Sequence, residues 1–116
     1  MIEINGVQLE FDMLDANTAE RYEDANLTLQ KQLAAMNLET MRTADAIRKQ
    51  CQIVFDYFDC IFGTGTADTI FAGKMHLGEC LDALEVVTNA STAQSKAFEE
   101  RFSRYRPNRA QRRSKV

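Results

Sequence analysis

The most reactive side chains in this sequence are one histidine and three cysteines, and their spacing does not favour catalysis or metal binding. His76 could act as a general base, but the sequence offers it no evident serine or cysteine partner with a third, orienting group. A structural zinc site needs about four cysteine or histidine ligands, commonly in close pairs, whereas Cys51, Cys60 and Cys80 are widely spaced. We therefore expect no catalytic residue, no cofactor and no metal, and reduced, buried thiols.

Two further patterns could indicate a catalytic or binding site, and both have simpler explanations. The carboxylate pairs Asp56/Asp59 and Glu99/Glu100 lie on the polar sides of predicted helices, where they would be solvated. The loop at residues 63–66 contains glycine and threonine, as phosphate-binding loops do, but it follows a helical pattern and lacks the lysine of the Walker motif. The sequence therefore predicts a protein that is not an enzyme.

Length and composition describe one small domain. The chain has 116 residues, of which 45% are apolar, enough for a single core. It contains no run of about eighteen apolar residues, so we expect no membrane-spanning helix. Its first residues lack a basic segment followed by an apolar run, so we expect no signal peptide and a cytoplasmic location.

Charge is distributed unevenly along the chain. Residues 1–100 carry all 17 acidic residues but only seven of the 14 basic ones, a net charge of −10, and residues 101–116 carry the other seven basic residues. A basic terminus could be a solvated end, or it could bind nucleic acid, an acidic protein or the acidic surface of another copy. We favour a protein partner over nucleic acid, because no recognition helix is evident and no aromatic residue follows Tyr105.

The N-terminal third of the chain predicts a β-hairpin followed by a helix. Apolar and polar residues alternate on both sides of Asn5-Gly6, a pair that suits a type I′ turn, so we expect strands near residues 2–4 and 7–11. Asp15 or Asn17 can cap a helix that starts near Thr18 and continues to about residue 37.

An apolar stripe at helical spacing organises the middle of the chain, and we expect its helix to begin near residue 38 and to end at Gly63 in a left-handed turn. No glycine or proline separates this helix from the preceding one, so residues 18–62 could form one helix or two. The stripe consists of Met41, Ala44, Ile47, Cys51, Val54, Phe55, Phe58 and Phe62.

Two more helices are expected after the loop. Thr66 is predicted to cap a short helix over residues 67–72, and His76 to cap a last helix that runs from Leu77 to about residue 104 or 105. Small polar residues at 89–95 make a kink or break plausible there. The apolar stripe of the last helix consists of Leu77, Cys80, Leu81, Leu84, Val87, Phe98, Phe102 and Tyr105.

These elements predict a mainly α (α+β) fold: a short N-terminal β-hairpin and a small bundle of three to four helices. We expect residues 1–106 to form the helical domain, with the hairpin at 1–12, and residues 107–116 to be a disordered basic tail. The predicted core contains Phe55, Phe58, Ile70, Leu81 and Leu84.

Several motifs, covering essentially the whole chain, resemble those of tail assembly chaperones from long-tailed phages and prophages of Gram-positive bacteria. The resemblance is carried by the Asn-Gly hairpin, the aromatic end of the long helix, the segment Phe62-Gly63-Thr64-Gly65, the sequence Glu79-Cys80-Leu81, and the C-terminal Asn108-Arg109-Ala110-Gln111-Arg112-Arg113. Two departures are Ala72-Gly73, where two small or polar residues including glycine are usual, and His76, where asparagine is commoner.

This resemblance implies a function in virion morphogenesis. Such chaperones coat the long, apolar tape measure protein and keep it soluble before the tail tube polymerises, and they are absent from the finished virion. The resemblance implies that this chain acts in the cytoplasm of the host bacterium, as the short form of a pair whose longer, frameshifted form touches the tail tube protein. The alternative is a nucleic-acid-associated phage accessory protein that binds through its arginine-rich tail.

The phenylalanine set is expected to lie mainly in the core, and part of it could instead be buried against another chain, so the candidate partner surfaces are one aromatic and one basic. The set consists of Phe55, Phe58, Phe62, Phe98 and Phe102. The acidic body and basic tail also predict weak, reversible self-association into helical or ring-like oligomers. The candidate partner-binding residues are Phe71, Phe98, Phe102, Tyr105, Arg109, Arg112, Arg113 and Lys115.

Overall fold

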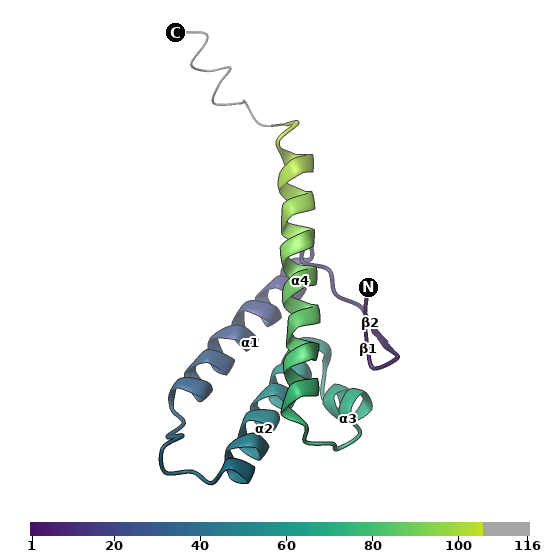
Figure 1. Ribbon diagram of the computed structural model, residues 1–116. Coiled ribbons are helices and arrows are strands. Elements are labelled where there is room, and N and C mark those ends of the chain that lie inside the picture. The colour runs from purple at the N-terminus through teal and green to yellow at the C-terminus, as the bar shows by residue number, and fades with distance from the viewer. Residues whose placement is uncertain (106–116) are drawn as a thin grey trace, which may run out of the picture.

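The computed structural model describes residues 1–105 and shows an N-terminal hairpin followed by four helices (Figure 1), which confirms the predicted fold class. Strands β1 (Ile2–Ile4) and β2 (Val7–Leu9) pair antiparallel, with Ile4 opposite Val7. Asn5 and Gly6 both have positive φ, 51° and 79°, as the predicted type I′ turn requires. The Asn5 side-chain amide also donates a hydrogen bond to the carbonyl of Ile70 at 3.2 Å, which joins the turn to the helical body.

Helix α1 (Ala16–Ala34) begins two residues earlier than predicted and ends about three residues earlier. Its cap is Asp15, whose carboxylate accepts a hydrogen bond from the Thr18 backbone N–H at 3.0 Å. Residues 35–42 then form an irregular connection that includes a turn, in which the Asn37 carbonyl accepts from the Thr40 N–H at 3.4 Å. Residues 18–62 are therefore two helices.

Helix α2 (Thr43–Phe62) carries most of the core. Its predicted start near residue 38 is wrong, so Met41 lies before the helix, and Ala44 in its first turn is exposed. The rest of the stripe is buried or partly buried, and Phe58 is completely inaccessible to solvent. Ile53 and Tyr57 are buried as well, because α2 packs against α1 in addition to α3 and α4.

The short helix α3 (Thr66–Phe71) closes one end of this core. Thr66 is its first helical residue, so the predicted cap is wrong by one position, and the Asp59 carboxylate from α2 accepts the Ala67 N–H at 2.9 Å. Gly63 has φ 111° and ψ 154°, a positive φ that favours glycine but not the predicted left-handed helical turn. The ring of Phe71 stacks on that of Phe55, with 5.0 Å between their centroids.

Helix α4 (Leu77–Phe102) is one continuous helix, without a break at residues 89–95. Its predicted cap is confirmed, because His76 Nδ1 accepts the Glu79 N–H at 3.1 Å. The adjacent Gly78 leaves room for this cap, since a Cβ there would lie 2.9 Å from the imidazole. The helix ends two or three residues before the predicted position.

The core-facing side of α4 differs from the predicted stripe at Leu81. Cys80, Ala83 and Val87 are buried, whereas Leu81 is 54% exposed and its assignment to the core is wrong. Leu81 lies one position, or about 100°, away from the buried Cys80 around the helix, so it faces outward. No helix among residues 1–105 is long and apolar enough to cross a membrane.

Candidate partner-binding surfaces

The C-terminal turns of α4 extend beyond the other elements (Figure 1). The middle of the helix is held to the body by Gln94, whose side-chain oxygen accepts the Met13 N–H and whose side-chain nitrogen donates to the Phe11 carbonyl, both at 2.8 Å. Ser91, one turn earlier, is buried. After Gln94 every residue of α4 is exposed, so the helix leaves the body within one turn of this anchor.

Three aromatic residues continue the side of α4 that carries Ser91 and Gln94. Phe98, Phe102 and Tyr105 follow at intervals of four and three, and we call them the aromatic stripe. They are 38%, 43% and 82% exposed, and the rings of Phe98 and Phe102 contact each other with 5.3 Å between centroids. Because the aromatic spacing persists beyond the body, the stripe presents a helix face of the kind that packs against another helix.

A shallow hollow adjoins the aromatic stripe. It has a volume of about 200 Å3, and Leu14, which is 52% exposed, and Arg101 line it together with the three aromatic residues. Glu99 is exposed beside Phe98, and Arg104 is exposed in the turn after the helix. The surface therefore combines an apolar centre with charged residues at its edge, the usual composition of a protein–protein interface.

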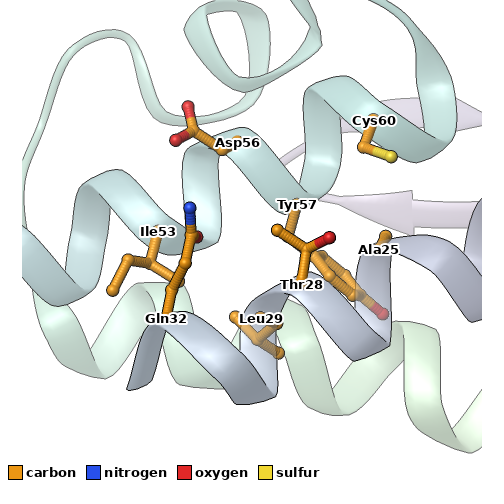
Figure 2. Close-up of a pocket in the computed structure, with 8 residues that line it drawn as sticks. All are labelled: Ala25, Thr28, Leu29, Gln32, Ile53, Asp56, Tyr57 and Cys60. Carbon is orange, nitrogen blue, oxygen red and sulfur yellow. The ribbon is translucent and has the colours of Figure 1, made fainter. Parts of the chain in front are cut away.

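A second recessed surface lies between α1 and α2, and we call it the α1–α2 groove. Its narrow end is a pocket of about 50 Å3, where Thr28 and Gln32 of α1 lie opposite Ile53 and Asp56 of α2 (Figure 2). A wider hollow of about 320 Å3 continues from the same Gln32, Ile53 and Asp56 towards Lys49. The remaining lining residues of the two hollows are Ala25, Leu29, Ala35, Gln52, Tyr57 and Cys60.

The sequence named all three residues of the aromatic stripe as candidates for partner binding but none of the groove, and the expectation that Phe98 and Phe102 lie in the core is wrong. Phe98, Phe102 and Tyr105 are exposed together, whereas Phe71 is only 4% exposed and packs in the core, apart from that surface. The groove depends on how two helices pack, and its lining residues are ordinary members of each helix. The predicted basic residues Arg109, Arg112, Arg113 and Lys115 lie outside the described residues.

The thiols differ in their surroundings. Cys51 and Cys80 are completely buried, and burial, with a smaller contribution from the neighbouring Cys51, raises the pKa of the Cys80 thiol to about 12. Cys60 is exposed at the narrow end of the groove, so the expectation that all three thiols are buried is wrong for it. Within residues 1–105, no three histidine, cysteine or acidic side chains come together as metal ligands would.

Comparison with known proteins assigns this chain to a family but does not indicate its activity. No curated protein and no solved structure matches it. A family model does match residues 5–116, a range that contains the hairpin turn and all four helices. The chain belongs to the family of unknown function DUF6673.

Proposed function

We propose that this protein is a tail assembly chaperone of long-tailed phages and prophages, which binds the tape measure protein and keeps it soluble before the tail tube polymerises. The observation that carries the proposal is the aromatic stripe, three large side chains that remain 38% to 82% exposed on a helix end that extends from the body. Exposed apolar clusters of this kind mark protein-binding sites. The motif resemblance along the chain supports the same function.

The client is a long helical protein with apolar stripes of its own. A helix that presents aromatic residues at intervals of four and three can pack along such a stripe, and the packing removes apolar area of both partners from water. Each copy offers only a short contact, so many copies are needed to cover one client. A small domain with an acidic body suits this task, because like charges on adjacent copies keep the coated client dispersed.

The basic C-terminus extends the binding surface. Arg101 and Arg104 flank the aromatic stripe, and five further basic residues follow within the next eleven positions. Their charge attracts acidic segments of the client at long range and is screened by salt. Apolar contacts at the stripe supply the part of the affinity that salt does not remove.

The proposal is tested by recovering the tape measure protein encoded in the same genome on immobilised chaperone at low and high salt. We expect Phe98→Ser/Phe102→Ser to lose most of the recovery at both salt concentrations, because it removes apolar contact. Deletion of residues 107–116 should reduce recovery more at low salt than at high salt and leave the melting temperature nearly unchanged. Leu27→Ser, at an exposed apolar position of α1, is the matched control and should behave as wild type.

The alternative function is binding to nucleic acid through the basic tail. It is favoured by the seven basic residues among the last sixteen. In that case the tail deletion would abolish salt-dependent binding to random DNA and leave recovery of the tape measure protein unchanged. Equal recovery of the client by wild type and by both variants at both salt concentrations would refute the chaperone proposal for these surfaces.

A further inference from the structure

We propose that the aromatic stripe of one copy docks in the α1–α2 groove of a second copy when no client is bound. The docked segment is α4 from Phe98 onward together with Tyr105, and the receiving surface is the pair of adjoining hollows between α1 and α2. This contact does not depend on the proposed function, although it would cover the same stripe. It would bury exposed aromatic area, which limits nonspecific aggregation.

The dimensions of the two surfaces match. At 1.5 Å per residue, the groove extends about 15 Å along α1 from Ala25 to Ala35, and the helical part of the stripe extends about 6 Å from Phe98 to Phe102, with Tyr105 in the turn that follows. The wider hollow, of about 320 Å3, has room for an aromatic side chain above Ile53. A helix lying in a groove between two helices is a recurring mode of protein recognition.

The charges of the two surfaces fix one orientation. On α2, Lys49 lies at the wide end of the groove, and Asp56 follows seven residues later towards the narrow end. On α4, Glu99 lies beside the start of the stripe, and Arg104 follows Phe102 in the turn after the helix. Glu100 lies about 200° around the helix from Phe98, on the opposite side. With α4 parallel to α2, both ends pair opposite charges, whereas the reverse orientation places like charges together.

The contact must form between copies and not within one chain. Gln94 holds the middle of α4 to Phe11 and Met13, and α4 continues from there as one helix, so its end cannot turn back to the groove of its own chain. Each copy has one stripe and one groove, which are different surfaces. Such a head-to-tail contact leaves a free surface at each end of a pair, and it therefore produces rings or open chains.

A mixing experiment tests this arrangement without any client. Phe98→Ser/Phe102→Ser removes the stripe and keeps the groove, and Gln32→Arg places a cation in the groove and keeps the stripe. Sedimentation velocity at low salt should show oligomers for wild type and a self-association roughly tenfold or more weaker for each variant alone. The equimolar mixture should form one-to-one dimers that do not grow further, because only one intact pair of surfaces remains.

Matched controls separate this result from general effects of charge and apolarity. Gln30→Arg adds the same charge to an exposed position of α1 outside the groove lining, and Leu27→Ser removes an exposed apolar side chain elsewhere on α1; both should associate as wild type. A mixture that stays monomeric while wild type associates would overturn the proposal, as would wild type that is monomeric at millimolar concentration. Association of the Gln32→Arg variant as strong as wild type would indicate a stripe-to-stripe contact instead.

A charge exchange tests the orientation. Lys49→Glu and Glu99→Lys should each weaken association, and the two changes combined in one chain should restore most of it. Failure to restore would overturn the parallel orientation. Because no client is present, a failed recovery of the tape measure protein would refute the proposed function and leave the dimer result standing, and the reverse also holds.

Discussion

At the scale of single residues, Phe58 is the most completely buried aromatic residue of the core. It is inaccessible to solvent, and the centroid of its ring lies 5.7 Å from the ring centroid of Phe71 and 6.0 Å from that of Phe62. We expect Phe58→Ala to lower the free energy of unfolding by about 3–5 kcal/mol, because it removes buried apolar contacts and leaves a cavity. Urea denaturation measures this change. Leu81→Ala is the control and should cost far less, and a similar loss at both positions would contradict the observed burial.

Sequence patterns predicted single residues well where local geometry determines their role. The cap positions Asp15 and His76 belong to this class, because a cap bonds to a backbone group only three residues away. The pattern failed at Leu81, where helical spacing allows several neighbouring faces and tertiary packing selects one. It also gave no indication that the Asp59 carboxylate would bind the start of α3, because that contact depends on the path of the loop.

At the scale of elements, the type of each helix was predictable but several of its limits were not. The separation of α1 from α2 occurs at a turn stabilised by Asn37 and Thr40, residues that can also occur within helices. Conversely, the small polar residues at 89–95 suggested a kink, yet Ser91 and Gln94 face the body and α4 continues through them. Within this segment Gln94 bonds to the backbone after β2, whereas Asn89, Thr92 and Ser95 are exposed.

Gln94 is the residue that we expect to hold α4 against the rest of the fold. Gln94→Ala should cost about 1–3 kcal/mol, because the half-buried Met13 N–H and Phe11 carbonyl would each lose a hydrogen-bond partner. Hydrogen exchange at the Met13 amide should accelerate in this variant. Ser95→Ala, at the adjacent exposed position, should leave both the free energy of unfolding and the exchange rate at Met13 nearly unchanged. Unaltered exchange at Met13 in the Gln94 variant would show that this amide is protected by other contacts.

At the scale of the whole molecule, the aromatic stripe lies at one end of the described residues, and most of the basic residues of the last sixteen follow it in the sequence. Composition was sufficient to predict the uneven charge, but helical spacing favoured Phe98 and Phe102 as core residues, and only the tertiary structure shows that they are exposed. The α1–α2 groove could not be predicted, since it arises from the packing of two helices whose sequences each have an ordinary amphipathic pattern. The fold thus provides one surface that sequence reasoning expected and one that it did not.

The central claim is that the aromatic stripe keeps an apolar, helical client in solution. Its most direct measurement is the soluble fraction of the tape measure protein when it is co-expressed with this chain. We predict a large increase with wild type and with the Leu27→Ser control, and little or no increase with Phe98→Ser/Phe102→Ser at equal expression. A soluble fraction that wild type does not raise, or that the stripe variant raises equally, would contradict the claim.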